Sequence, residues 1–377
     1  MFFAGQGAYM KGRGFAVHAI SSPGLGLTEF VMRDHVTPHE VEVCRTISPV
    51  RDAIALYRLW RLLRRISPVI VEAHTSKAGI LGMAAAWIAG VPIRIYHNHG
   101  MALLSARGIK RKLLWWCEKI SCQLAHKVIY VAESVRDAAL REGVCDLRKA
   151  TAVTSINGLD AVNRFNPLKA GFNMRDGIRQ RCGIPPDVLV VGFVGRLFRV
   201  KGVEDLMRAW REVSKRFVTA HMLVVGAPDT MVPLPTSVNN AMKSDPRIHL
   251  PGFVHDPVPY YSAMDLLVLP SHHEGLGYVL LEASAMGLPV IGTRIPGIMD
   301  AIVEDVTGLL VEPGDHEGLI KAMCTYLSDP RLRKKHGLAG RDYVLMKFSQ
   351  EQVWERLAQE YHEALSALDL VCAGQSS

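Results

Sequence analysis

Short apolar runs alternate with longer amphipathic runs along most of this chain. The apolar runs have the length and the branched side chains of buried strands, and the runs between them carry apolar residues at helical spacing. This order predicts an α/β fold with two parallel, doubly wound sheets, because each helix returns the chain to start the next strand beside the last. The predicted strands are 15–20, 41–44, 69–73, 92–96, 128–131, 152–156, 188–194, 221–225, 248–250, 265–270, 289–292 and 308–311, and helices are predicted at 54–66, 77–89, 110–125, 133–142 and 277–286.

The length of 377 residues exceeds what one hydrophobic core usually serves, so we expect two domains. The connection between them is expected within residues 161–187, which mix polar and apolar side chains and contain three prolines. We therefore predict a first domain at 1–167, a linker at 168–186, a second domain at 187–348 and a final helical segment with its tail at 349–377.

Two glutamates bracket a glycine-rich turn in the second predicted domain. Glu274 and Glu282 stand eight positions apart, and between them the chain passes through Gly275 and Gly277 into an apolar helix. A turn from a strand into a helix presents unpaired backbone N–H groups and the positive end of the helix dipole, and both favour a phosphate. One carboxylate then lies beside the phosphate and the other about two helical turns away. This arrangement suits a nucleotide sugar, which has hydroxyl groups on both sides of its diphosphate.

The pair resembles the E-x7-E signature of the family-4 retaining glycosyltransferases. Other segments are similar to the same family: 193–197 with 201–202 to its diphosphate-binding segment, 157–160 to its interdomain hinge, and 288–293 to the strand after the signature. The similarity covers most of residues 15–345. It implies the GT-B fold, in which two Rossmann-like domains face a cleft, and a final helix that crosses back to the first domain.

The resemblance implies roles for residues of the second domain. Arg196 and Lys201 lie between a predicted strand and a helix, where they are expected to neutralise the donor diphosphate as it leaves. Glu274 is expected to bind hydroxyls of the donor sugar and Glu282 those of the ribose. The alternative for Glu282, a solvated surface glutamate, is opposed by its apolar neighbours. Further donor-binding residues are expected to be Gly195, Gly275, Leu276, Gly277 and Tyr278, with Phe253 and Val254 beside the base or, alternatively, in the core.

Histidines at predicted strand ends are the candidates in the first domain. The resemblance implies that His99 lies near the donor sugar, at the end of the sheet where ligands of parallel sheets bind. His97 competes for this role, since the two alternate along the chain and could point to opposite faces. His74 and Lys77 are expected to contact an acceptor phosphate, and Gly5 and Gln6 belong to the same acceptor side. No cofactor and no metal is expected, because we find neither a histidine and carboxylate grouping nor a D-x-D motif between strands.

The beginning of the chain departs from the family pattern. Family members open with an apolar strand that leads into a glycine-bearing loop, whereas residues 1–9 already resemble that loop or the helix after it. A central parallel strand is paired on both edges, so its loss would expose ladder groups and apolar surface. We expect that the first strand is missing here and that the true start lies upstream of Met1, the alternative being a damaged domain.

Positive charge is concentrated in the first half of the chain. Residues 1–170 hold 23 Lys and Arg against 12 Asp and Glu, and residues 171–377 hold 21 against 24. The cations gather in 58–65 and 107–119, where aromatic and aliphatic residues interleave at helical spacing. Such segments can lie on an anionic membrane surface or attract a diphosphate-bearing substrate, and ordinary surface helices are the alternative. We expect no nucleic-acid partner, because no nucleic-acid motif accompanies the charge.

Other features indicate the compartment. No apolar run reaches the roughly 18 residues of a membrane span, and no signal peptide precedes the first domain. The 7 cysteines are odd in number and form no C-x-x-C pair, which favours reduced thiols over disulfides or a zinc site. We expect a cytoplasmic protein, peripheral on the inner face of the cytoplasmic membrane.

These observations predict a retaining glycosyltransferase that carries a hexose from a nucleotide sugar, UDP-linked, to a hydroxyl of a glycan or polyprenyl-diphosphate-linked acceptor. The segments 19–24 and 74–79 resemble those of enzymes that assemble bacterial capsule, exopolysaccharide and O-antigen. Two alternatives stay open. One is a UDP-sugar 2-epimerase of the same fold, although we cannot place the acid and base residues it needs. The other is a non-catalytic nucleotide-sugar-binding subunit, supported only by the missing strand.

Overall fold

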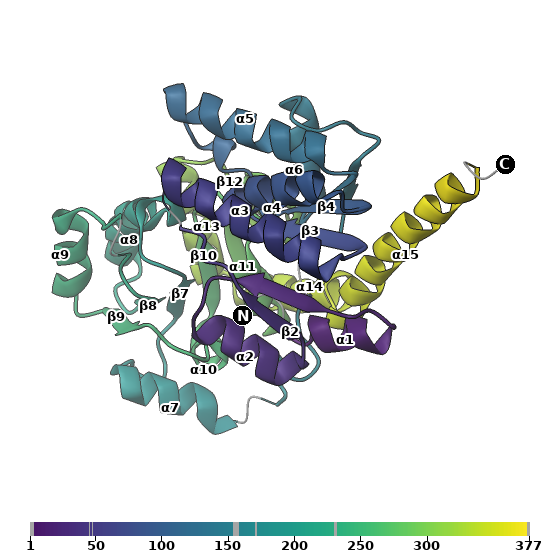
Figure 1. Ribbon diagram of the computed structural model, residues 1–377. Helices are drawn as coiled ribbons and strands as arrows, with labels where there is room; N and C mark the ends of the chain where they lie inside the picture. The colour runs from purple at the N-terminus through teal and green to yellow at the C-terminus, as the bar shows by residue number, and fades with distance from the viewer. Residues whose placement is uncertain are drawn as a thin grey trace. The chain divides into compact units, whose positions relative to one another are not determined.

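The computed structural model describes residues 4–44, 46, 48–153, 158–169, 172–229 and 232–374. The chain forms two compact units, the first comprising Met1–Gly158 and Gln350–Ser377 and the second Leu159–Ser349. Both are built from parallel strands with helices between them, which confirms the predicted α/β class (Figure 1). The predicted hinge residue Asn157 and the end of the strand predicted at 152–156 lie outside the described residues.

Six parallel strands form one sheet in the second unit. Their order is β12-β11-β10-β7-β8-β9, so the chain starts at β7, proceeds to one edge, and then returns to the other side of β7. Every position of β7, β10 and β11 is buried, because helices cover both faces of such a sheet, and the edge strands β9 and β12 are partly exposed. The strands are β7 Val190–Val194, β8 His221–Val225, β9 Ile248–Gly252, β10 Leu266–Leu269, β11 Val290–Thr293 and β12 Gly308–Val311. The helices are α7 Phe172–Cys182, η2 Arg199–Lys201, α8 Val203–Arg216, α9 Thr236–Ser244, α10 Val258–Ala263, α11 Tyr278–Ala285, α12 Ile298–Ala301, α13 His316–Ser328 and α14 Pro330–Lys347.

Helix α7 occupies much of the segment predicted as a linker, and it belongs to the second unit. Arg179 on this helix is 1% exposed, and its guanidinium donates to the carbonyls of Ala263, Pro186 and Val188. It also lies 3.0 Å from Asp265 Oδ2. A buried guanidinium needs this many acceptors, because each unpaired N–H would cost free energy. Sequence patterns did not predict the helix, since its anchors lie on other elements.

The strands of the first unit form two separate sheets. A four-stranded sheet has the order β3-β4-β5-β6, and β1 pairs only with β2 among the described residues. The strands are β1 His18–Ser21, β2 Thr37–Glu40, β3 Ile70–His74, β4 Ile93–Asn98, β5 Lys127–Tyr130 and β6 Ala150–Ala152. The helices are α1 Gln6–Gly12, α2 Leu25–Asp34, α3 Pro49–Ile66, α4 Ser76–Ala89, η1 Ala102–Leu104, α5 Gly108–Leu124, α6 Glu133–Arg141 and α15 Gln350–Gly374.

The strand predicted at 41–44 is wrong. The chain pairs with β1 four residues earlier, at Thr37–Glu40, and the ladder ends where the Val41 amide donates to the Ser21 carbonyl at 2.9 Å. The alternation of Val41 and Val43 suggested a strand, whereas the polar residues that form β2 gave no such signal. Hydrogen bonding to β1 decides the register here, and an apolar pattern does not report it.

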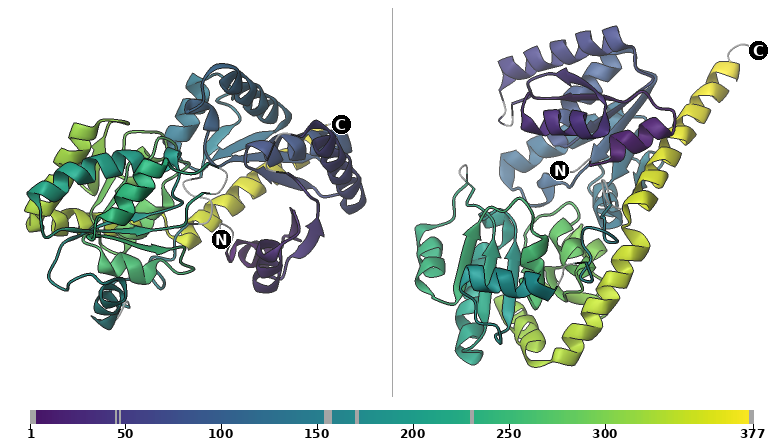
Figure 2. Two further views of the ribbon diagram at one scale, coloured as in Figure 1. Left: turned by 90° about the vertical axis from the view of Figure 1, so that its left-hand side faces the viewer. Right: turned by 90° about the horizontal axis from the view of Figure 1, so that it is seen from below.

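Helix α15 completes the core of the first unit, where it runs beside α1 and the four-stranded sheet (Figure 2). Its residues Val353, Leu357 and Tyr361 pack in one cluster with Ile95 and Ile129 of the sheet. Tyr9 of α1 donates to Glu355 Oε2 at 2.6 Å, which ties the two helices together. Among the described helices, none combines the length and the apolar composition needed to cross a lipid bilayer.

Candidate active site

Two loops meet in the second unit where the strand order reverses, between β7 and β10. The first loop follows β7 and ends at Gly202, and the second follows β10. They approach closely, because the His272 amide donates to the Val200 carbonyl at 2.8 Å and a Cβ on Gly202 would overlap the Pro270 carbonyl oxygen. Gly202 also has φ 71°, which favours glycine. In open parallel sheets ligands bind at such a switch point, so this is the candidate donor site.

Lys201 and Glu274 face each other across these loops. Lys201 Nζ lies 2.5 Å from Glu274 Oε1, and both side chains are mostly buried. The Ser271 hydroxyl donates to the same carboxylate oxygen at 2.8 Å. The structure therefore brings together the cation and the carboxylate that the sequence placed in one site, and it adds Ser271 as a residue that orients Glu274.

Arg196 makes a different contact. Its guanidinium lies 3.0 Å from Asp229 Oδ2 and stacks 4.9 Å from the ring centre of Phe198. The Arg196 side chain is 64% exposed. We expected Arg196 and Lys201 to converge on one anion, and in this structure each is paired with its own carboxylate instead. A phosphate that binds either cation would therefore share it with that carboxylate or displace the carboxylate.

Glu282 lies on α11 and is held by Tyr261 of α10, whose hydroxyl donates to Oε2 at 2.6 Å. Burial raises the pKa of Glu282 to about 6, although this hydrogen bond acts in the opposite direction. Burial raises the pKa of Tyr261 well above its usual value, and the nearby carboxylate of Glu282 raises it further. Glu282 is therefore a partly buried carboxylate with a fixed orientation, as a ligand-binding group requires, and the surface alternative does not apply.

The glycine-rich turn places the other predicted donor-binding residues. Gly277 has φ 65° and precedes α11 directly, so the turn leads into the helix N-terminus as predicted. Leu276 is 2% exposed, which leaves its backbone rather than its side chain for a ligand. Gly275 approaches Gly297 so closely that a Cβ on Gly297 would overlap the Gly275 carbonyl.

Phe253 follows β9 and is 67% exposed, so its alternative core role is wrong. Its ring meets His255 edge to face at 5.0 Å between ring centres, and Val254 between them is half-buried. An exposed aromatic ring at the carboxyl end of a strand is available to stack on a base.

The first unit gathers histidines at the carboxyl ends of β3 and β4. His74 and His97 are register partners in the parallel pair. His74 Nδ1 lies 3.0 Å from His99 Nε2, and the rings of His97 and His99 are 5.1 Å apart. We expected that His97 and His99 could point to opposite faces; that is wrong, because residues two positions apart in an extended chain share one face, and both rings lie beside His74.

Glu72 joins this cluster from β3, and its Oε1 lies 2.7 Å from His97 Nδ1. Burial would raise the pKa of Glu72, but His74, His97 and a hydrogen bond from Tyr361 outweigh it and lower the pKa to about 2. Burial lowers the pKa of His74 to about 4 and that of His99 well below its usual value. The sequence predicted no histidine and carboxylate grouping, and the fold forms one.

The remaining acceptor-side candidates have structural partners. Lys77 Nζ lies 2.7 Å from Asp52 Oδ1. The amides of Gly5 and Gly7 donate to the two carboxylate oxygens of Asp34 at 3.2 and 3.0 Å, and Gln6 between them is 8% exposed. This loop does bind a carboxylate through its backbone, but the carboxylate comes from α2 of the same unit.

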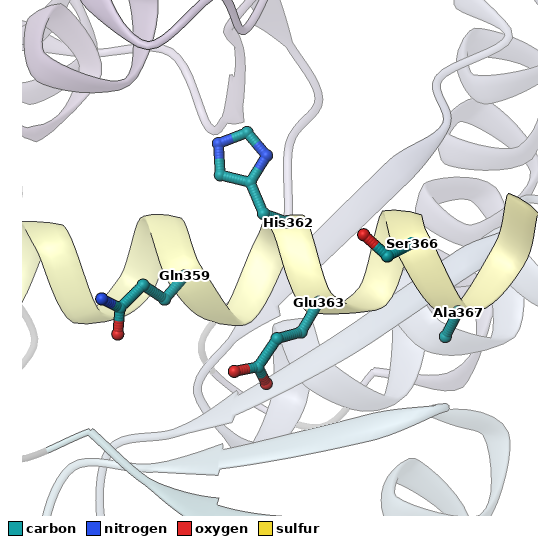
Figure 3. Close-up of a pocket in the computed structure, with 5 residues that line it drawn as sticks. All are labelled: Gln359, His362, Glu363, Ser366 and Ala367. Atoms are coloured by element: carbon teal, nitrogen blue, oxygen red, sulfur yellow. The ribbon is translucent and has the colours of Figure 1, made fainter.

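Three residues of these sites were not predicted from the sequence. Tyr261 and Ser271 act through contacts that only the folded chain creates. Glu72 could have been found, because Glu72 and His74 alternate in a strand and therefore share one face. A separate pocket on α15 offers less, since Gln359, His362, Glu363, Ser366 and Ala367 all come from one face of this helix (Figure 3). Glu363 already lies 3.3 Å from Lys127 Nζ.

Comparison with known proteins gives a consistent result. The family model described as glycosyl transferases group 1 matches residues 188–329, and the glycosyl transferase 4-like domain matches residues 2–153. The capsular polysaccharide biosynthesis glycosyltransferase CapM of Staphylococcus aureus is 30% identical over 96% of this chain and 93% of its own. The UDP-Gal:alpha-D-GlcNAc-diphosphoundecaprenol alpha-1,3-galactosyltransferase of Escherichia coli is 29% identical over 76% of this chain and 73% of its own. A glycosyltransferase structure from Rickettsia africae ESF-5 has a TM-score of 0.78 at 21% identity, covering 96% of this chain and 93% of that one.

Proposed function

The chain belongs to the group 1 glycosyltransferases with the GT-B fold, and from this premise we propose that it transfers a hexose from a UDP-sugar to a lipid-linked or glycan acceptor in bacterial surface polysaccharide synthesis. The observation that carries the proposal is the Lys201–Glu274 pair at the point where the strand order reverses. A cation there can neutralise a diphosphate, and the carboxylate beside it can bind sugar hydroxyls. CapM supports the pathway, and the Escherichia coli relative supports a UDP-linked donor and a diphosphate-linked acceptor.

The proposed reaction retains the configuration of the donor carbon. The bond from that carbon to the diphosphate oxygen breaks, and the acceptor oxygen forms its bond on the same face. The acceptor proton passes to the departing diphosphate oxygen. Lys201 and Arg196 stabilise the negative charge that develops on this oxygen, so the proposed transfer needs no metal and no cofactor. Glu282 binds the ribose, Phe253 stacks on the base, and Glu274 orients the sugar.

We also propose that the first unit binds an anionic membrane surface. Arg58, Arg61, Arg64 and Arg65 are exposed on α3, and Lys110 and Lys112 are exposed on α5. Arg111, which we included in this patch, lies 2.6 Å from Glu142 and is partly neutralised. Helix α5 also exposes an apolar stripe of Ile109, Leu113, Trp116 and Ile120. Cations beside exposed apolar side chains suit the headgroup region of a bilayer.

The test is a donor screen on the full chain. Thermal shift with UDP-galactose, UDP-glucose, UDP-N-acetylglucosamine and GDP-mannose should identify a UDP-sugar as the stabilising ligand. That donor should then release UDP only when a sugar on a polyprenyl diphosphate is added, and NMR of the product should show the anomeric configuration of the donor. Conversion of the donor without any acceptor would indicate an epimerase. Absence of both stabilisation and release, across all donors and acceptors, would contradict the proposal.

A further inference from the structure

Three imidazole groups at the ends of β3 and β4 lie close enough to share one ion. The ligating nitrogens of His74, His97 and His99 are all within 4.8 Å of one another. His74 Nδ1 and His99 Nε2 are 3.0 Å apart. Two nitrogens on one tetrahedral zinc ion are about 3.3 Å apart, given Zn–N bonds of about 2.0–2.1 Å. Only small side-chain shifts therefore separate this cluster from the geometry of a metal site.

His97 provides an independent observation. Its residue is 0% exposed, and its Nε2 has no hydrogen-bond partner in the described part of the chain. Its Nδ1 lies 2.7 Å from Glu72 Oε1. An ionised carboxylate can only accept, so Nδ1 carries the proton and Nε2 keeps a lone pair. A buried lone pair without a partner costs free energy, and metal binding would remove that cost.

Glu72 lies behind two of the three imidazoles. Its Oε1 accepts from His97, and its Oε2 lies 3.8 Å from His74 Nε2 and accepts a hydrogen bond from the Tyr361 hydroxyl. The nitrogens of His74 and His97 that face the cluster are thus the ones that do not face Glu72. In metal sites the second nitrogen of a ligating histidine usually donates to a carboxylate in this way.

The backbone beside the cluster is also strained. Thr75, directly after His74, has φ 66° and ψ 161°, a backbone conformation that residues other than glycine rarely adopt. Such a residue costs about 1–3 kcal/mol and persists where the surrounding structure holds it, often at a functional site. The Gly79 amide donates to the Thr75 carbonyl at 2.7 Å, and a Cβ on Gly79 would overlap the ring of Tyr96 on β4.

We propose that His74 Nδ1, His97 Nε2 and His99 Nε2 bind one divalent transition-metal ion, with Glu72 as the carboxylate that orients His97 and His74. Three imidazoles favour Zn²⁺, Ni²⁺ or Cu²⁺ over Mg²⁺ and Ca²⁺, which prefer oxygen. Three protein ligands leave a fourth position for an oxygen ligand. The proposed transfer itself uses no metal, because Arg196 and Lys201 carry the diphosphate charge in it.

The test uses the full chain, stripped with EDTA and titrated with Zn²⁺ alone by calorimetry. One equivalent of zinc should bind, and Co²⁺ in its place should give the visible absorption of a tetrahedral nitrogen-ligated ion. His97→Phe should abolish the Co²⁺ spectrum, and Glu72→Gln should weaken zinc binding about 10–100-fold. His221→Asn is the matched control, because His221 and His249 form a second imidazole contact at 2.8 Å outside this cluster.

Circular dichroism checks that each variant is folded, and His99→Ala replaces His97→Phe if the buried substitution prevents folding. Less than stoichiometric zinc binding by the wild type would overturn the proposal. So would equal zinc affinity in wild type and in a folded His97 or His99 variant, or equal affinity for Zn²⁺ and Mg²⁺. None of these readouts depends on transfer activity, so a failed donor screen leaves this test intact.

Discussion

The ammonium of Lys201 and the carboxylate of Glu274 are in contact at 2.5 Å, so each neutralises the other at the proposed donor site. A diphosphate that enters the site competes with Glu274 for Lys201. Lys201→Met should therefore weaken UDP binding about 10-fold or more and lower turnover, because a charge-assisted contact to phosphate is lost. Glu274→Gln should bind UDP as tightly as wild type or more tightly. It should nevertheless have a lower kcat, because the transition state loses about 2–4 kcal/mol of stabilisation.

Calorimetry with UDP and steady-state kinetics at saturating donor separate these effects. Lys215→Met is the control, because Lys215 is 63% exposed and pairs with Glu212 on its own helix. Near-wild-type kinetics in both site variants would show that the pair does not belong to the active site.

The buried carboxylate of Glu282 gives a pH dependence of stability. Its pKa is raised by burial to about 6, so the folded chain holds this proton at a pH where the unfolded chain has lost it. The charged form therefore destabilises the fold, and this cost appears as the pH rises from about 4.5 to about 6. The free energy of unfolding of Glu282→Gln minus that of wild type should therefore be about 2 kcal/mol larger at pH 8 than at pH 4. Urea unfolding at both pH values measures this, with exposed Glu351→Gln as the control; a difference that does not vary with pH would contradict the buried, charged state.

Glycine at position 202 should be required by the close approach of the two donor-site loops. Gly202→Ala places a Cβ against the Pro270 carbonyl in addition to the strain of φ 71°. Gly183→Ala is a matched control, because Gly183 has φ 69° and a Cβ at that position would meet nothing within 4 Å. Both variants should lose about 1–2 kcal/mol from the backbone strain. Only Gly202→Ala should also lose UDP binding, as measured by thermal shift, and equal UDP affinity in the two variants would separate this loop from the donor site.

The parts of the fold that the sequence predicted are those that depend on local patterns. Strands β7 to β12 are mostly apolar, because helices cover both faces of their sheet, and their positions were predicted closely. The turn at Gly277 was predicted because glycine and an apolar helix adjoin there. Strand β2 was missed because it consists of three polar residues and a proline, which give no apolar strand pattern.

The parts of the candidate site that were not predicted depend on contacts between distant elements. The Tyr261 hydroxyl of α10 donates to Glu282 of α11, and no spacing in the chain predicts this contact between two elements. The histidine cluster needed the pairing of His74 with His97 across β3 and β4. Once that pairing is known, the E-x-H spacing on β3 and the H-x-H spacing at the end of β4 place Glu72 and the three imidazoles together.

Membrane binding, if it uses the exposed cations of α3 and α5, should weaken with salt. Reversal of Arg58, Arg61, Lys110 and Lys112 to glutamate should release the chain from anionic vesicles, since the attraction is screened over a Debye length of about 8 Å in physiological salt. Arg111→Glu alone should have a smaller effect, because Arg111 is paired with Glu142. Vesicle sedimentation measures both. Equal binding to neutral and anionic vesicles, or binding to neither, would contradict the proposed surface.

Helix α7 should be required for the stability of the second unit. Residues 159–349 contain all the proposed donor-binding residues and form one compact unit, so this fragment should fold and be stabilised by UDP through mass action. A shorter fragment, 184–349, lacks α7 and with it the Arg179 guanidinium that pairs with Asp265. Loss of one partner from a buried ion pair costs about 3–5 kcal/mol, so the shorter fragment should unfold at lower urea concentration or fail to fold. Arg179→Ala in the full chain is the companion variant. Equal stability of both fragments would show that α7 is a linker. A folded 159–349 fragment whose melting temperature does not change with millimolar UDP would refute the placement of the donor site in this unit.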